Sequence, residues 1–96
     1  MLVEIRSVEH KALLRLLESN QTKGLPTNHI SKIRRILTAL ITASSMETLN
    51  AFPGWRLHQL VGDREGTWSM NVTGNLRITF TVVEDEIFNL NLEDYH

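Results

Sequence analysis

The sequence predicts an α+β domain in which a short N-terminal strand and two helices precede a four-strand antiparallel meander. Apolar residues recur with helical period in the first half of the chain, and period-two alternation replaces that pattern after residue 44. Short polar turns, two of which contain glycine, separate the alternating stretches, as hairpin connections do. Packing the helices on one face of the sheet would bury these apolar sides, so we expect that two-layer architecture.

The first helix is predicted from a capping residue and an apolar stripe. Residues 1–6 alternate partly and form the expected first strand. Ser7 is a suitable N-cap for a helix that ends near Ser19, and Glu9 favours its first turn through the helix dipole. The apolar stripe consists of Ala12, Leu13, Leu16 and Leu17.

The second helix follows a connection at residues 20–26, which contains a glycine and a proline. We expect Thr27 or Asn28 to cap this helix and the helix to end near Ala43. Its apolar positions are spaced by three and four residues: Ile30, Ile33, Leu37, Leu40 and Ile41.

Four alternating stretches predict the meander. The expected strands are residues 55–60, 67–72, 76–83 and 86–92. The predicted inward side chains are Leu57, Trp68, Met70, Val72, Leu76, Ile78, Phe80 and Val82. In the turn at residues 62–66 we expect local charge pairing among Asp63, Arg64 and Glu65.

Length and composition indicate one small domain that spans residues 1–96, with 42% hydrophobic residues for a single core. The absence of cysteine excludes disulfides and thiolate metal sites. The longest apolar run is too short to cross a bilayer, and the first residues lack the basic segment of a secretory signal. We therefore expect a soluble cytoplasmic protein.

The net charge of −1 conceals an asymmetry between the two halves of the chain. Residues 1–40 contain seven Lys or Arg and three Glu, whereas residues 41–96 contain three Arg and eight acidic residues. A uniformly basic domain would indicate nucleic-acid binding, and this chain is not one. Its acidic half contains only three cations: Arg56, Arg64 and Arg77.

Period two predicts which polar side chains share the face opposite the core. If Leu57 points inward, Arg56 and His58 point outward, as does Arg77 in its own strand. The last strand leads directly to three further titratable residues. The meander can therefore gather on one concave surface Arg56, His58, Arg77, Asp94, Tyr95 and His96.

This set suits phosphodiester cleavage, which needs a base for the 2′-hydroxyl, an acid for the leaving oxygen and a cation for the charge on phosphorus. Imidazoles fit the first two roles at neutral pH, and a guanidinium fits the third. No pair of histidines is spaced by four residues and no carboxylate repeats, so we expect no metal site.

Each candidate also has an ordinary structural explanation. His58 can be a surface histidine, Arg77 the solvated side of an amphipathic strand, and residues 94–96 a disordered end. Trp55 and Trp68 are more often core residues than platforms for bases. Arginines 34 and 35 are usually solvated in such a helix, and contact with RNA or a partner is the alternative.

Five short motifs follow one another in the second half of the chain: Trp55-Arg56-Leu57-His58, Gly62-Asp63-Arg64-Glu65-Gly66, Trp68-Ser69, Asn75-Leu76-Arg77-Ile78-Thr79-Phe80 and Leu92-Glu93-Asp94-Tyr95-His96. Together they resemble the HigB branch of the RelE/ParE toxins, the plasmid-maintenance killer proteins. The resemblance covers residues 55–96, and residues 1–54 match only in their pattern of elements.

The resemblance implies a RelE-like fold and a ribosome-dependent mRNA endonuclease, which acts as the toxin of a type II toxin–antitoxin pair. Such toxins cut mRNA in the ribosomal A site, inhibit translation and require no metal or other cofactor. The implied catalytic residues are His58, Arg77, Asp94, Tyr95 and His96. The two histidines would share base and acid work in an order that stays open, with the aspartate assisting, the arginine on the phosphate and the tyrosine stacking or positioning.

The candidate substrate-binding residues are Arg56, Arg64, Arg34 and Arg35. The implied partners are the ribosome, mRNA and a HigA-like helix-turn-helix antitoxin, through which operator DNA would be contacted indirectly. No membrane is expected among the partners. Relatives commonly carry a lysine where Val61 stands, a basic residue at Thr73 and an aromatic one at Leu76. Fewer cations weaken attraction to ribosomal RNA.

The loss of those cations keeps a second hypothesis open. The same fold can act without catalysis, as a module that binds an antitoxin and co-represses DNA, or as a gyrase poison. Growth arrest without mRNA cleavage would favour this alternative.

Overall fold

The computed structural model describes residues 4–43, 49 and 55–94. The helices are α1 (Lys11–Ser19) and α2 (Ile30–Thr42), and α2 continues from a 3₁₀ turn, η1 (Thr27–His29). The strands are β1 (Glu4–Ile5), β2 (His58–Gln59), β3 (Thr67–Asn71), β4 (Leu76–Val83) and β5 (Glu86–Asp94). A further 3₁₀ turn, η3 (Gly62–Arg64), connects β2 to β3.

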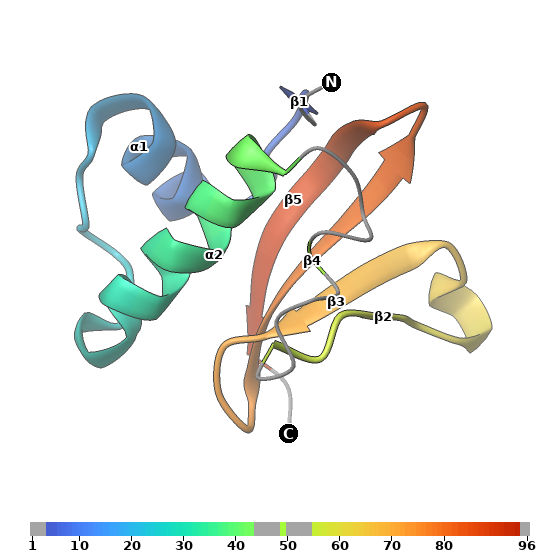
Figure 1. Ribbon diagram of the computed structural model, residues 1–96. Coiled ribbons are helices and arrows are strands. Elements are labelled where there is room, and N and C mark those ends of the chain that lie inside the picture. The colour runs from blue at the N-terminus through green and yellow to red at the C-terminus, as the bar shows by residue number, and fades with distance from the viewer. Residues whose placement is uncertain (1–3, 44–48, 50–54, 95–96) are drawn as a thin grey trace.

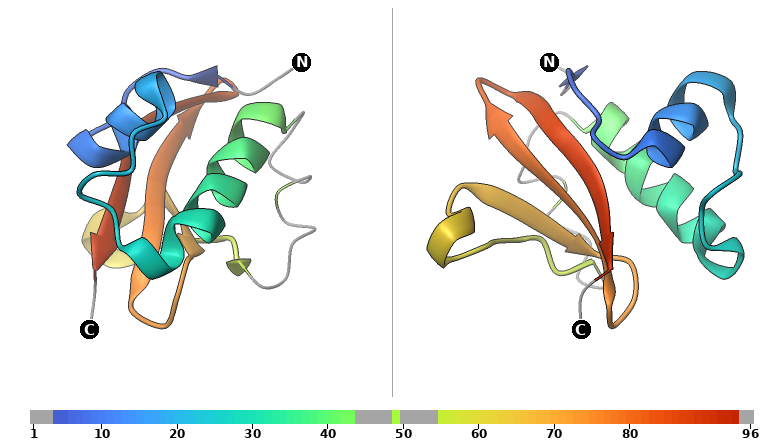
Figure 2. Two further views of the ribbon diagram at one scale, coloured as in Figure 1. Left: turned by 90° about the vertical axis from the view of Figure 1, so that its left-hand side faces the viewer. Right: turned by 180° about the vertical axis from the view of Figure 1, so that it is seen from behind.

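The strands form one sheet in the order β1-β5-β4-β3-β2. Strands β2 to β5 pair as the predicted antiparallel meander, and β1 lies at the edge, parallel to β5. Both helices cover the same face of this sheet (Figure 1). The views in Figure 2 show the same two layers and a strong twist of the sheet between β5 and β2. The predicted fold class and the placement of the helices are therefore confirmed.

The core lies between these two layers. The largest fully buried side chains come from both: Leu13, Ile33, Ile36, Leu40, Leu49, Met70, Ile78, Phe80, Ile87 and Leu90. Trp55 is also buried and Trp68 packs against the core, in agreement with the structural explanation of both residues. Among the helices of the described residues, none has the length and apolar character needed to cross a membrane.

The caps of the two helices differ from those predicted. The N-cap of α1 is His10, whose Nδ1 accepts a hydrogen bond from the backbone N–H of Leu13 at 3.3 Å. Ser7 instead uses its hydroxyl to accept from the backbone N–H of Asn89 at 2.7 Å, so tertiary contact with β5 replaces the capping role. The helical turn of the second segment begins at Thr27, but the N-cap of α2 is His29, which has no side-chain capping bond.

The predicted strand at residues 55–60 is shorter in the structure, because only His58 and Gln59 pair with β3. Arg56 has a left-handed backbone, with φ of +47°. A residue in this conformation interrupts the extended backbone on which the alternation of side chains depends. The period-two argument that placed Arg56 beside His58 is therefore wrong.

The last strand contains a bulge that changes its register. Thr79 pairs with Asn91 and Thr81 with Phe88, so the pairing shifts between these positions. Asn89 absorbs the extra residue with a left-handed φ of +58°. The bulge lets Ile87 and Leu90 both face the core although three positions separate them.

Candidate active site on the outward face of the sheet

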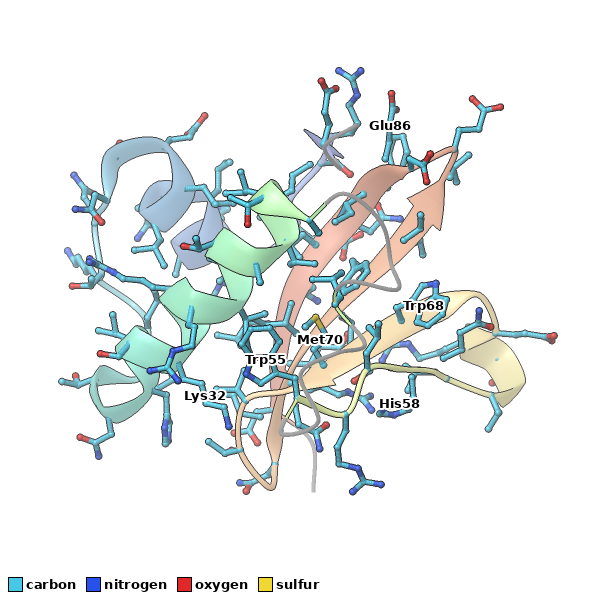
Figure 3. All side chains as sticks on the ribbon, in the orientation of Figure 1. Lys32, Trp55, His58, Trp68, Met70 and Glu86 are labelled. Atoms are coloured by element: carbon cyan, nitrogen blue, oxygen red, sulfur yellow. The ribbon has the colours of Figure 1, made fainter. Side chains whose placement is uncertain are left out.

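The face of the sheet opposite the helices carries rows of polar side chains. His58 on β2 lies directly opposite Ser69 on β3, which lies opposite Thr79 on β4. Residues opposite one another in an antiparallel pair point to the same face, and Arg77 lies two positions before Thr79. His58 and Arg77 therefore share the outward face, as the alternation predicts. In Figure 3, His58 lies below β2, on the side away from the helices. Trp55 and Met70 lie between α2 and the sheet.

The His58 ring is exposed and has a defined tautomer. Its Nδ1 lies 2.6 Å from the backbone carbonyl oxygen of Arg56. A carbonyl oxygen can only accept, so Nδ1 carries the proton and donates it to this bond. In the neutral imidazole, Nε2 then has an unprotonated lone pair, which is the group that a general base needs.

Arg77 takes part in an ion-pair cluster centred on Glu93. The two residues lie opposite each other on β4 and β5, with Arg77 Nη2 at 3.4 Å from Glu93 Oε1. Arg64 from η3 binds the same carboxylate with two bonds, Nη1 to Oε1 at 2.6 Å and Nη2 to Oε2 at 2.5 Å. The hydroxyl of Thr79 donates to Oε2. We call these four residues the Glu93 cluster.

The charge of the cluster stabilises the ionised carboxylate. The hydrogen bonds from Arg64 lower the pKa of Glu93 from its ordinary 4.5 to about 2, with further contributions from Thr79 and Arg77 that outweigh partial burial. Because Arg64 comes from the β2–β3 connection and Glu93 from β5, this pair spans the intervening strands. Ser69 and Thr79 are fully buried on the outward face beneath it.

Two buried polar atoms on β3 lie between His58 and Arg77. Ser69, opposite His58, has a hydroxyl without a hydrogen-bond partner among the described residues. Asn71, opposite Arg77, has a buried Oδ1 atom in the same situation. Buried polar groups are normally satisfied, so this part of the face suits a polar ligand.

The predicted site residues are only partly brought together. Asp94 is exposed at the end of β5 opposite Leu76, which belongs to the face that packs against the helices. Asp94 therefore does not share the face of His58 and Arg77, contrary to the concave-surface prediction, because Glu93 occupies the outward position. Tyr95 and His96 lie outside the described residues.

The four predicted binding arginines lie in different parts of the molecule. Arg56 is exposed just before β2. Arg64 pairs with Glu93, 29 residues away, rather than with the local acids of its turn as predicted. Arg34 and Arg35 are exposed on α2, in the layer on the other side of the sheet from His58.

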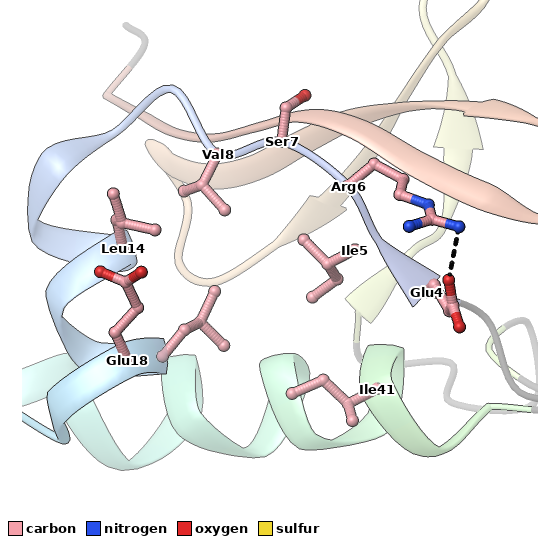
Figure 4. Close-up of a pocket in the computed structure, with 9 residues that line it drawn as sticks. Glu4, Ile5, Arg6, Ser7, Val8, Leu14, Glu18 and Ile41 are labelled. Carbon is pink, nitrogen blue, oxygen red and sulfur yellow. Dashed lines mark ion pairs between the residues drawn. The ribbon is translucent and has the colours of Figure 1, made fainter.

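The surface of the described residues includes two hollows that bear on the site. One has a volume of about 180 Å³ and lies beside the Glu93 cluster, with walls of threonine and asparagine side chains from β3, β4 and β5. The other, of about 640 Å³, is a mainly apolar groove between β1 and the two helices, shown in Figure 4. None of the predicted site residues within the described ranges lines this second groove. The described residues contain no group of three His, Asp or Glu side chains suited to a metal ion.

Glu93 is the participant that the sequence reasoning did not single out. Its outward direction could have been predicted, because Glu93 lies two positions after Asn91 and follows the same alternation. The register that sets it opposite Arg77, and the turn that brings Arg64 to it, are tertiary features. Neither can be read from the spacing of residues along the chain.

Comparisons with known proteins give one consistent group. The family model described as the RelE-like toxin of the type II toxin–antitoxin system HigB matches residues 6–96. The protein named endoribonuclease HigB from Proteus vulgaris is 42% identical over 92 residues, which are 96% of this chain and 99% of that protein.

Solved structures share the fold at low sequence identity. The DinJ–YafQ toxin–antitoxin complex of E. coli aligns with a TM-score of 0.62 at 15% identity, over 98% of this chain and 93% of that one. The YoeB–YefM complex of Staphylococcus aureus aligns with a TM-score of 0.56 at 15% identity, over 100% and 99% of the two chains. These matches agree with the two-layer architecture described above.

Proposed function

This chain belongs to the HigB family of RelE-like toxins of type II toxin–antitoxin systems, and we propose that it is a metal-independent endoribonuclease that cuts mRNA in the ribosomal A site. The observation that carries the proposal is the outward face of the sheet. It combines an imidazole with an available Nε2, a nearby guanidinium and buried polar atoms between them. The 42% identity to a protein named endoribonuclease HigB supports the same chemistry.

In the proposed reaction, His58 Nε2 takes the proton of the ribose 2′-hydroxyl, whose oxygen attacks the adjacent phosphorus. The bond from phosphorus to the 5′-oxygen breaks, and that oxygen receives a proton from His96. Arg77 neutralises the charge that builds on the phosphate oxygens. The fixed tautomer of His58 supports its assignment as the base, because a base must present a bare nitrogen. Asp94 would assist by orienting His96, the general acid. Tyr95 would stack on or position the nucleobase.

The exposed arginines have separate proposed roles. Arg56 precedes β2 near His58 and would contact the mRNA backbone. Arg34 and Arg35 belong to the opposite layer, so they would contact ribosomal RNA rather than the cleaved mRNA. Such a reaction takes place where ribosomes translate, in the cytoplasm.

The proposed partner in the resting cell is a helix-turn-helix antitoxin of the HigA type, through which the complex would reach operator DNA. The family description as a toxin of a type II system supports an antitoxin partner. The HigA-like identity of that partner is part of the proposal.

Cleavage mapping on ribosomes programmed with a defined mRNA tests the function. We expect wild-type protein to cut within the A-site codon, and His58→Ala and His96→Ala to lower the rate by about 10²–10⁴, the usual contribution of an acid or base. His29→Ala is the matched control, because it removes a histidine from the helix layer.

Two results would contradict the proposal. Full activity of the His58 and His96 variants would remove them from the chemistry. Growth arrest by wild-type protein without any mRNA cleavage would favour the non-catalytic module or the gyrase poison.

A further inference from the structure

The Glu93 cluster joins three parts of the proposed site through one carboxylate. Arg64 belongs to the turn that follows the His58 strand, Arg77 to β4, and Glu93 to the strand that leads into Asp94. Oxygen Oε1 contacts a guanidinium nitrogen of each arginine, and Oε2 contacts Arg64 again and the Thr79 hydroxyl. A single side chain therefore sets the relative position of two cations.

The burial of the cluster makes this carboxylate difficult to replace. The side chains of Glu93 and Arg77 are only 19% and 17% exposed, and that of Arg64 is 43% exposed. Two guanidinium groups that meet at one point repel each other, and partial removal from water strengthens the repulsion. A carboxylate between them removes most of that cost, whereas a neutral amide of the same shape would not.

We infer that Glu93 is a positioning residue that orients Arg77 toward the scissile phosphate and holds the Arg64 turn against β5. The inference rests on the proposed endoribonuclease function. A guanidinium carries five N–H donors in a rigid plane, so a carboxylate that contacts one nitrogen fixes the direction of the others. Glu93 would act through Arg77 and does not itself contact the reacting atoms.

The two Arg64 bonds extend the same role to the C-terminal end of β5. Glu93 directly precedes Asp94 in β5, and its two bonds to Arg64 tie this end of the strand to the β2–β3 connection. Residues 95 and 96 continue the chain from this anchored point. The carboxylate thus links the turn that follows the His58 strand to the strand that contains Asp94.

Single-turnover cleavage of mRNA on programmed ribosomes tests the inference, with the ribosome concentration varied to separate the maximal rate from the half-saturating concentration. The variants are Glu93→Gln, Glu93→Asp and Arg77→Ala beside wild type. Glu86→Gln is the matched control, because Glu86 lies at the other end of β5 and bonds a different arginine, Arg6, at 2.9 Å. Thermal unfolding of each variant sets a temperature at which all are folded.

We expect Glu93→Gln to lower the maximal rate by about 10–100-fold, the size of effect that a misplaced catalytic group has, and to change the half-saturating concentration by less than about threefold. Glu93→Asp retains the charge but withdraws it by one methylene, so its maximal rate should lie between those of Glu93→Gln and wild type. Glu86→Gln should cut at the wild-type rate.

Distinct outcomes separate this inference from the proposed function. If Arg77→Ala is impaired while Glu93→Gln cuts within about threefold of wild type, the inference is overturned and the function stands. An effect of Glu93→Gln on the half-saturating concentration alone would also overturn it, because Glu93 would then serve docking. If Glu93→Gln does not fold, Glu93→Asp decides, and a maximal rate equal to that of wild type overturns the inference. Absence of cleavage by wild type would refute the function itself.

Discussion

Replacing Glu93 with glutamine should reduce stability in a manner that depends on pH. Glutamine resembles a protonated glutamate in shape, so the variant keeps the packing of the cluster and loses the negative charge. The pKa of Glu93 is lowered to about 2, chiefly by the Arg64 bonds. Between the unfolded and folded values of the pKa, the unfolded chain binds more protons than the native protein, so stability rises with pH through that range.

The magnitude follows from the same two values. The ordinary pKa of 4.5 exceeds the folded value of about 2 by about 2.5, which is about 3.4 kcal/mol at about 1.36 kcal/mol per pKa unit. Arg64 is 43% exposed, and water screens such a pair, so we expect about 1–2 kcal/mol of this to appear as stability. The contribution is complete above about pH 5 and is lost as the pH falls toward 2.

Urea unfolding of wild type and Glu93→Gln at several pH values measures this difference. The free energy of unfolding should be about 1–2 kcal/mol lower for the variant at pH 7, and the gap should shrink to about two fifths of that value at pH 3. Glu86→Gln, which removes an exposed pair with Arg6, should cost less. A gap that stays constant between pH 7 and pH 3 would refute the reasoning, because it would then arise from packing rather than from the charge.

Three further predictions concern the fold that supports the site. Asn89 has a φ of +58° in the β5 bulge, so Asn89→Val should lower the free energy of unfolding by about 1–3 kcal/mol, whereas Asn89→Gly should leave it nearly unchanged in urea titrations. Phe80 is fully buried between the layers, so Phe80→Ala should lower the free energy of unfolding by about 3–5 kcal/mol. A decrease of less than about 1 kcal/mol would show that the core had been wrongly placed. Burial lowers the pKa of His10 below 6.5, and the charge of Arg15 lowers it further. The capping bond from the Leu13 N–H requires that His10 Nδ1 be unprotonated. The free energy of unfolding should therefore fall as the pH drops below 6.5. His10→Asn keeps a cap that does not titrate, and equal pH dependence of wild type and this variant between pH 7 and 5 would contradict the role of the ring.

Much of the outward face was predictable, because the alternation of side chains in a strand follows from the order of residues along the chain. Met70, Ile78 and Phe80 face the core as the alternation predicts, and His58 and Arg77 share the other face. The prediction failed for Arg56, where a left-handed backbone ends the alternation one residue before Leu57. Alternation holds only while the chain remains extended, and the pattern of apolar residues does not report a local change of φ.

The predictions of the helix caps failed for a related reason. Ser7 has the right chemistry for a cap and the right distance from the apolar stripe, yet its hydroxyl bonds the backbone of Asn89. His10 takes the cap instead, a residue type that capping preferences do not favour. Competition between a local and a distant partner is decided by where β5 lies, and residue preferences do not contain that information.

The sequence by itself determined the element order, the two-layer architecture, the inward apolar faces and the family to which the chain belongs, since these depend on periodicity and on motifs read along one chain. Tertiary structure decided the register of β4 against β5, the bulge at Asn89 and the meeting of Arg64, Arg77 and Glu93. These features arise from pairing between segments far apart in the chain, where a shift of one residue turns every side chain to the other face. The carboxylate that joins the two arginines of the Glu93 cluster therefore becomes evident only when the strands are assembled.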